Sequence, residues 1–355
     1  MKKAHRYVIT TVLQSIGIIL SILIVLQIFI LFMNQMGDMG RGAYHFKQAL
    51  VYVLLRLPYD LSNSFPIVCL LGCLVGLSIL ANHSELVILR ASGLSIADVI
   101  KIVAVAGIGL VVLVMLLTET FLPKMIFKAN NLKLEALNNG QLFRQAQSLW
   151  FRHQDNFWYV AGVADAHELR DVTVFSKDKN NHIYAIENYQ KLLWKDGQWV
   201  GVSAEMTYFS KNHKMSRFQA DMLDKIKLPL GPGFFKHIQR TPDEMSIRNL
   251  YHRIQHLQAH QDMSKEKLIF WQRLLQPLNT LLMMILAIPF IFGPLRSSTM
   301  GAKLIVGIAM GFGFYIINQL FGFMSQVYQI KPFVGAILPL IIFSLIGAYL
   351  LRLSR

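Results

Sequence analysis

The chain has 355 residues, of which 54% are hydrophobic and only 15% are charged. This balance is typical of an integral membrane protein and argues against a soluble globular domain. The net charge of +15 would also suit a nucleic-acid-binding protein. Much of that charge flanks apolar segments, however, so we predict no nucleic-acid partner.

Six apolar segments are long enough to cross a bilayer as helices, for which about 20 residues are needed. They cover residues 8–33, 61–81, 97–122, 268–292, 302–327 and 333–353. We predict an α-helical integral membrane protein with six transmembrane helices, three in residues 1–122 and three in residues 265–355. Residues 47–57, before Pro58, fit either an interfacial helix or an extension of the second span.

The distribution of Lys and Arg predicts the orientation. Basic residues at both termini and in two short turns fall on one side, which the positive-inside rule assigns to the cytoplasm. We therefore expect both termini to be cytoplasmic and residues 123–264 to lie outside. The bias is moderate, because the opposite loops also carry basic residues (Arg41, Lys47, Arg56 and Lys331).

A short charged segment separates the second and third spans. It is amphipathic and helix-prone, and it lies in a tight turn at residues 83–93, where a partner in the aqueous compartment can bind it. This arrangement indicates the coupling element of a transporter membrane subunit. The residues that we assign to this contact are Ser84, Glu85, Leu86, Arg90, Ala91 and Gly93.

The polar middle of the chain has a different pattern. Residues 145–235 contain short alternating stretches with turn signals every 8–12 residues, including Asp196-Gly197, a favoured hairpin pair. This pattern predicts an all-β sandwich or barrel inserted between the third and fourth spans. Ile247, Leu250 and Ile254 then recur at helical spacing after a potential N-cap at Ser246, so residues 123–264 are expected to hold the β domain and a connecting helix.

Several side chains in and near the spans leave two interpretations open. Glu119 is either functional or a structural hydrogen-bonding group. Phe314 and Phe321, in the fifth span, either accommodate an amphiphile or pack against other helices. A basic group beyond the third span either clamps phosphates or forms a solvated, lipid-binding flank. That group comprises Lys124, Lys128 and Lys133, with Arg41 on the same side.

Other motifs bear on packing and on cofactors. Gly72 with Gly76, and Gly307 with Gly311, form Gly-x-x-x-Gly faces that predict close helix packing. The sequence has no Gly-x-x-x-x-Gly-Lys-Ser/Thr loop and no clear metal-ligand spacing. We predict a non-catalytic subunit that binds no cofactor itself.

Two motifs resemble one known family. Residues 82–93 are similar to the cytoplasmic coupling helix of the LptF/LptG lipopolysaccharide export permeases. Residues 292–297 (Phe-Gly-Pro-Leu-Arg-Ser) and 311–315 (Gly-Phe-Gly-Phe-Tyr) look like the LptG branch of that family. The resemblance covers essentially the whole chain. It implies a jellyroll-like β domain in the periplasm, a Gram-negative inner membrane location and lipopolysaccharide as the substrate.

The resemblance also implies a division of labour. ATP-Mg is expected in a separate LptB-like ATPase dimer, beside an LptF-like sister permease and LptC- and LptA-like bridge proteins. Glu85 matches the family's coupling glutamate, and Lys133 matches a basic position near the substrate phosphates. Family members can carry lysines in and just after the first span, whereas residues 31–38 here have none. We hypothesise that Arg41 takes over part of that role.

Two alternatives to a substrate-carrying permease remain at this point. One is a mechanotransmitting subunit that couples an ATPase to periplasmic partners without carrying substrate. The other is a scaffold, for which Glu85 would be dispensable. A lipid-facing cavity at spans one and five would favour the substrate-carrying permease.

Overall fold

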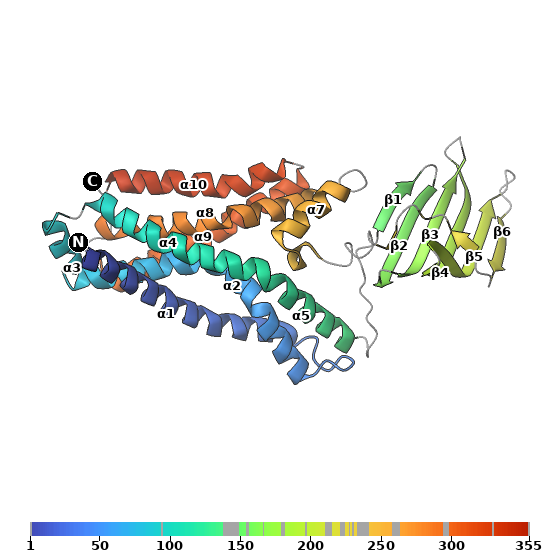
Figure 1. The fold of residues 1–355 in the computed structure, drawn as a ribbon, viewed down its shortest axis with the longest axis horizontal. Helices are drawn as coiled ribbons and strands as arrows, with labels where there is room; N and C mark the ends of the chain where they lie inside the picture. The colour runs from blue at the N-terminus through green and yellow to red at the C-terminus, as the bar shows by residue number, and fades with distance from the viewer. Residues whose placement is uncertain are drawn as a thin grey trace.

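The computed structural model has a long helical bundle and a separate β-sheet (Figure 1). It describes residues 2–93, 95–137, 149–153, 156–165, 167–178, 182–195, 197–209, 215–220, 224–226, 228, 231–232, 241–257, 263–293, 298–328 and 330–353. The predicted motif at residues 294–297 and the side chain of Arg90 lie outside the described part.

The six predicted spans are confirmed as helices long and apolar enough to cross a membrane. Residues 47–57 continue the second of these helices, so they form an extension of that span and not a separate interfacial helix. The helices are α1 (Lys2–Gln35), α2 (Phe46–Asn82), α4 (Ile96–Thr120), α8 (Ser264–Phe292), α9 (Met300–Val327) and α10 (Pro332–Leu353).

The two glycine motifs mark close helix contacts, as predicted. A Cβ added at Gly72 would lie 2.5 Å from the Cα atom of Ile16, so α1 crosses α2 almost at backbone contact. A Cβ at Gly307 of α9 would lie 2.5 Å from Cδ1 of Leu74 in α2. Small residues therefore bring two other spans against α2, the most buried of the six spans.

Beyond α4 the chain forms a helix that the sequence reading did not anticipate. After a break at Phe121, α5 (Leu122–Leu137) runs on and packs along α2. Ala129 of α5 is fully buried in a cluster with Tyr52 and Val53 of α2. The first residues of the segment assigned to the outer domain thus pack with the membrane helices.

The inserted domain is an antiparallel β-sheet, and the predicted hairpins are confirmed. In the described part, β1 to β6 pair in chain order as a meander, and β7 pairs with β5. Leu169, Leu192 and Trp199 are fully buried in its core. Gly197 supplies the positive φ of 79° in the turn between β4 and β5. The strands are β1 (Leu149–His153), β2 (Asn156–Asp165), β3 (Glu168–Lys177), β4 (Ile183–Lys195), β5 (Gln198–Phe209), β6 (Met215–Ala220) and β7 (Asp224–Ile226).

The chain returns to the bundle through the 3-10 turn η1 (Pro242–Glu244), which is tied to three helices. The hydroxyl of Tyr59 in α2 donates to Oδ1 of Asp243 at 2.9 Å. The guanidinium of Arg273 in α8 donates to the backbone carbonyl of Asp243 at 2.9 Å. Nδ2 of Asn130 in α5 donates to Oε1 of Glu244 at 2.6 Å. The return segment is therefore held firmly on the bundle.

The predicted connecting helix is α7 (Ile247–Leu257), and Ser246 begins it as expected. The backbone N–H of Asn249 donates to Oγ of Ser246 at 3.3 Å. The backbone N–H of Ile247 donates to Oε2 of Glu119 at 3.0 Å. Glu119 thus accepts from a helix N-terminus, where a carboxylate is favoured.

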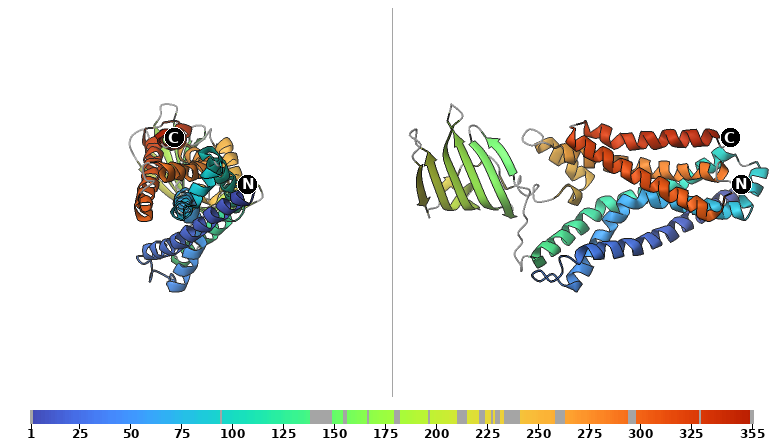
Figure 2. Two further views of the ribbon diagram at one scale, coloured as in Figure 1. Left: turned by 90° about the vertical axis from the view of Figure 1, so that its left-hand side faces the viewer. Right: turned by 180° about the vertical axis from the view of Figure 1, so that it is seen from behind.

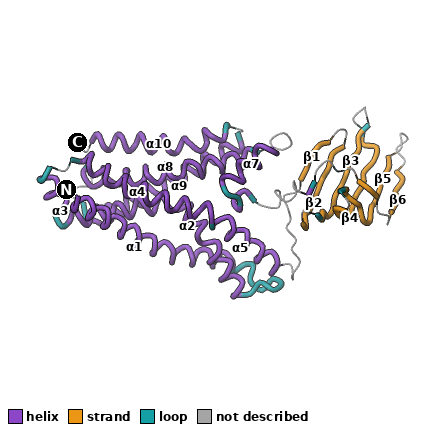
Figure 3. Tube along the Cα trace, in the orientation of Figure 1, coloured by secondary structure: helices purple, strands orange, loops and turns teal. Residues whose placement is uncertain are grey.

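The bundle has two distinct ends (Figures 1 and 2). Both chain termini and the short helix α3 (Glu85–Ala91) lie at one end, which we call the terminal end. The helices α5 and α7 lie toward the other end, and the strands lie beyond them; we call this the β-domain end (Figure 3).

Candidate functional site

The predicted coupling segment at the terminal end folds as the seven-residue helix α3. Two residues with positive φ flank it, Ser84 at 58° and Gly93 at 99°. Glycine adopts this backbone region freely, whereas a serine there is uncommon. The sharp turns on both sides hold α3 as a separate element between α2 and α4.

The apolar residues of α3 face two ways. Leu86 is buried in the core of the bundle, where it anchors the helix. Val87 and Ile88 are 55% and 65% exposed. This end of the bundle also carries the polar termini, so the two exposed residues present an apolar surface next to an aqueous compartment, a feature that marks interaction sites.

Glu85 stands at the start of α3. The hydroxyl of Tyr7 in α1 donates to its Oε1 at 3.2 Å, which links the coupling helix to the first span. The other oxygen, Oε2, has no hydrogen-bond partner among the described residues. One oxygen of the carboxylate is therefore positioned by α1, and the other is buried with its hydrogen-bonding capacity unused among the described residues.

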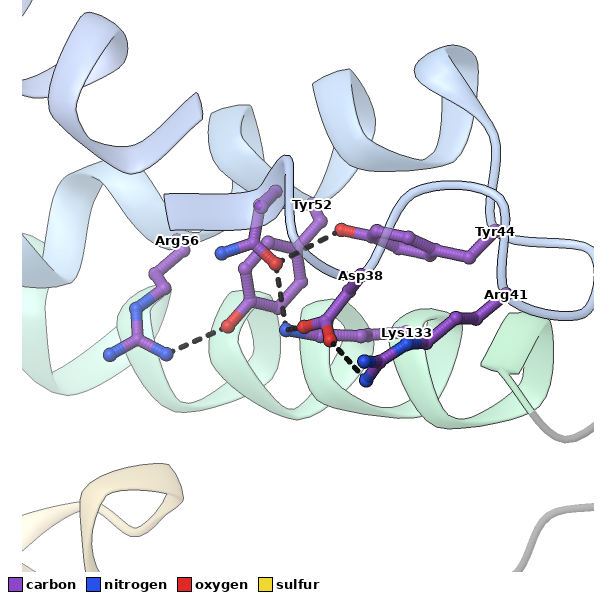
Figure 4. Close-up of polar contacts among 7 residues, drawn as sticks. Asp38, Arg41, Tyr44, Tyr52, Arg56 and Lys133 are labelled. Carbon is purple, nitrogen blue, oxygen red and sulfur yellow. Dashed lines mark hydrogen bonds and ion pairs between the residues drawn. The ribbon is translucent and has the colours of Figure 1, made fainter. Parts of the chain in front are cut away.

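The predicted basic residues at the β-domain end are only partly brought together (Figure 4). Nζ of Lys133, on α5, lies 2.8 Å from Oδ2 of Asp38 and donates to Oε1 of Gln35 at 2.7 Å. Arg41 lies 3.2 Å from Oδ1 of the same Asp38. The Lys133 ammonium lowers the pKa of Asp38 below its usual range. One carboxylate thus joins the two cations, and we call Gln35, Asp38, Arg41 and Lys133 the Asp38 cluster.

Aromatic rings hold the lysine of this cluster. Nζ of Lys133 lies 5.1 Å from the centre of the Tyr52 ring and 5.8 Å from that of Tyr44. Burial raises the pKa of Tyr44 to about 12, so its hydroxyl stays protonated and donates to Gln35 at 3.2 Å. Lys133 is therefore preorganised, whereas Arg41, with its side chain 71% exposed, is free to swing toward a ligand.

Lys124 and Lys128 lie elsewhere on α5. Both are exposed, and among the described residues neither makes an ion pair. Lys124 lines a separate hollow with Glu119 and the start of α7. The structure therefore does not bring these two lysines into the Asp38 cluster.

A cavity of about 490 Å³ lies between α1, α2, α8 and α9, with η1 at its edge. Gln27 of α1 and Phe314 of α9 lie on its wall, together with parts of α2 and α8 near the β-domain end. Phe321 does not line the cavity, so the two phenylalanines predicted to act together are separated in the structure. Spans one and five both face this cavity.

Several of these residues escaped the sequence reading. Asp38 and Gln35 brace Lys133 from about 95 positions away in the chain, and no local pattern links them. Asp243 and Arg273 meet at the cavity edge from segments 30 positions apart. In the described part of the chain, no group of three His, Cys, Asp or Glu residues is placed to hold a metal ion.

Comparison with known proteins agrees with this geometry. Residues 6–353 match the family model described as lipopolysaccharide export system permease LptF/LptG. The chain is 33% identical over 354 residues to the lipopolysaccharide export system permease protein LptG of Escherichia coli (strain K12), which covers 98% of this chain and 97% of that protein. It is 31% identical over 358 residues to the protein of the same name from Haemophilus influenzae (strain ATCC 51907 / DSM 11121 / KW20 / Rd), covering 99% and 98%. The chain therefore belongs to the LptF/LptG family of lipopolysaccharide export system permeases.

Proposed function

We propose that this permease is the non-catalytic half of an ATP-driven exporter in the inner membrane of a Gram-negative cell. Both termini are cytoplasmic, and the β domain is periplasmic. The support is the concentration of basic residues at the terminal end, which the positive-inside rule assigns to the cytoplasm. In this orientation α3 meets cytoplasmic partners, and the cavity lies at the level of the outer leaflet.

We propose that α3 binds a separate LptB-like ATPase dimer, which holds the ATP-Mg. The conformational change of that dimer is passed to α3. Val87 and Ile88 supply an exposed apolar contact, and Glu85 supplies a partly exposed carboxylate, whose buried Oε2 has no hydrogen-bond partner among the described residues. Ser84, Arg90, Ala91 and Gly93 complete the segment. Because Leu86 is buried in the bundle core and Tyr7 joins Glu85 to α1, a push on α3 is passed to α1 and α2.

We propose that lipopolysaccharide enters the cavity between α1 and α9 and leaves toward the β domain. Phe314 and the apolar part of the wall, which includes Leu31 and Ile67, receive acyl chains. Lys133 and Arg41 meet phosphates above them, with Asp38 released as the anion takes its place. Lys124 and Lys128 add positive charge further along α5.

The other expected partners are inferred from the size of the cavity and from the open edges of the β-sheet. A cavity of about 490 Å³ is too small for a large glycolipid, so an LptF-like sister permease is needed to complete the path. In the described sheet, β1 and β6 each pair with one neighbour only. An open strand edge is the expected contact for LptC- and LptA-like bridge proteins, because it can extend the sheet into a partner.

One observation carries the proposal: α1 and α9 line a common cavity. This feature favours a substrate-carrying permease over a mechanotransmitting subunit or a scaffold. A photoreactive phenylalanine analogue at position 314 of the complex in proteoliposomes tests it. The matched control is position 312, two residues away on α9, where Phe312 is 61% exposed and lies off the cavity wall.

We expect ATP-dependent crosslinking of lipopolysaccharide at position 314 and only background at position 312. Equal crosslinking at both positions would indicate ordinary contact with membrane lipid. No crosslinking at position 314 in a complex that still exports would show that the substrate bypasses this cavity.

A further inference from the structure

The cavity wall is unusually rich in side-chain amides. Of its 21 lining residues, eight are Asn or Gln. They come from all four helices, so they surround the space and do not form a single stripe. Six of them are Gln27 and Asn34 of α1, Asn63 of α2, Gln272 and Gln276 of α8, and Asn318 of α9.

The charged residues of the wall cancel one another. Two are arginines and two are aspartates. Nε of Arg56 lies 3.4 Å from Oδ2 of Asp60, close enough for attraction although not aligned for a hydrogen bond. Arg273 donates to the backbone carbonyl of Asp243 at 2.9 Å, and the Asp243 side chain accepts from Tyr59 at 2.9 Å. These charges are therefore occupied within the protein.

Several amides, in contrast, have unused hydrogen-bonding capacity. The side chains of Asn34, Gln272 and Asn318 make no hydrogen bond to another described residue and line the cavity. Oδ1 of Asn279 is buried and also lacks a partner among the described residues. An unpaired buried polar atom costs about 1–3 kcal/mol, a cost that applies to Asn279. Asn34 is exposed and Gln272 and Asn318 are partly exposed, so their amides are open to a ligand in the cavity.

The chemistry of this wall points to a particular kind of ligand group. A carboxamide presents both donors and an acceptor without net charge, which matches hydroxyl and amide groups. A phosphate would instead favour free Arg or Lys side chains. We propose that the cavity recognises the neutral hydroxyl and amide groups of the glycolipid, through Gln272, Asn318 and Asn34, and leaves phosphate recognition to residues outside it. This inference rests on the proposed function of the cavity.

The test uses the full complex with its ATPase and sister permease in nanodiscs. Two probes are compared, a bisphosphorylated lipid A and the same lipid after enzymatic removal of both phosphates. The variants Gln272→Met and Asn318→Leu keep the side-chain size and remove the amide. The matched control is Gln255→Met on α7, which removes an amide that bonds to Tyr251 away from the cavity.

We expect each cavity variant to weaken binding of both lipids by the same factor, about fivefold, which corresponds to one lost hydrogen bond. The double variant is expected to lose more affinity than either single variant, because it removes both amides from the cavity wall. Gln255→Met is expected to bind like the wild type. The conservative variants Gln272→Asn and Asn318→Gln retain an amide and are expected to keep most of the affinity, which separates recognition from misfolding.

Lys133→Ala supplies the opposite pattern, with a loss confined to the phosphorylated lipid. The inference is overturned if the amide variants bind both lipids normally, or if they weaken only the phosphorylated lipid. Wild-type complex that binds the phosphorylated lipid but not the dephosphorylated one also overturns it. Wild-type complex that binds neither lipid contradicts the proposed function itself.

Discussion

The two ends of this permease are built in different ways. At the terminal end, the proposed contact with the ATPase is one continuous segment, α3, whose residues are neighbours in the chain. At the β-domain end, the cavity and the Asp38 cluster are assembled from α1, α2, α5, α8, α9 and η1. A contact made by one segment can be lost through one residue, whereas a site spread over six elements loses its function in smaller steps.

The largest effect is expected from reversing the charge of α3. In Glu85→Lys, the carboxylate of the proposed ATPase contact becomes a cation, so export is expected to stop while the chain still inserts and folds. Glu85 is partly exposed at one end of the bundle, so only a small change in the free energy of unfolding is expected. Lipopolysaccharide transfer by reconstituted complex is the measurement, with the melting temperature as a check on folding.

A matched pair separates this effect from general loss of charge. Glu85→Gln is expected to impair export strongly, whereas Glu135→Gln changes an exposed glutamate of α5 and is expected to export normally. Equal loss in both variants would show that α3 is not the specific contact.

The second-largest effect is expected where α1 crosses α2. Gly72→Ala places a Cβ 2.5 Å from Ile16 Cα, so α1 must move away from α2. Overpacking of this kind typically costs about 1–3 kcal/mol, and we expect a clearly lower melting temperature of the purified complex. Gly109→Ala is the control, because a Cβ there meets nothing within 4 Å. Equal melting temperatures of the Gly72→Ala and Gly109→Ala complexes would mean that α1 can move away from α2 without a loss of stability.

A smaller effect is expected at the Asp38 cluster. Lys133→Ala removes the preorganised cation and is expected to lower affinity for phosphorylated lipid about tenfold, the loss of one charge-assisted hydrogen bond. Arg41→Ala is expected to have a weaker effect, since its side chain is 71% exposed. Normal binding and export by Arg41→Ala would remove the hypothesis that it substitutes for first-span lysines.

The control for both variants is Lys101→Ala in α4, which removes a cation paired with Asp98 at 3.5 Å, outside the cluster. It is expected to leave lipid affinity unchanged. The loss in Lys133→Ala should also shrink as salt is added, because the attraction between a partly exposed cation and a phosphate is screened in part.

The smallest effect is a pH dependence of stability at Asp38. Its pKa is lowered in the folded protein, so the pairing stabilises the fold at pH values above the usual pKa of about 3.8 and is lost as pH falls below it. The contribution of a partly exposed pair is below about 1 kcal/mol. Asp38→Asn is expected to melt slightly lower than wild type at pH 7, with the gap narrowing as the pH falls below about 3.8. A gap that is constant with pH would assign no role to the carboxylate charge.

The contrast between the ends also explains what could be predicted from sequence. The spans, the hairpins and α3 follow from local patterns of apolar and turn-forming residues, and the structure has them all. The cavity and the link from Lys133 to Asp38 depend on which helices meet, which no local pattern reveals. Helix α5 was missed because its buried face is narrow, with Ala129 among lysines that suggested a solvated segment.

The central claim is that α3 and the cavity are mechanically coupled. The most direct test is the distance between spin labels in a Gln27→Cys, Asn318→Cys double variant, which places one label on each side of the cavity. The native Cys69 and Cys73 are buried and are expected to resist labelling. In the complete complex, ATP should change the distance between the labels, and adding Glu85→Lys should abolish that change. The same ATP-dependent change in the Glu85→Lys complex would contradict the claim.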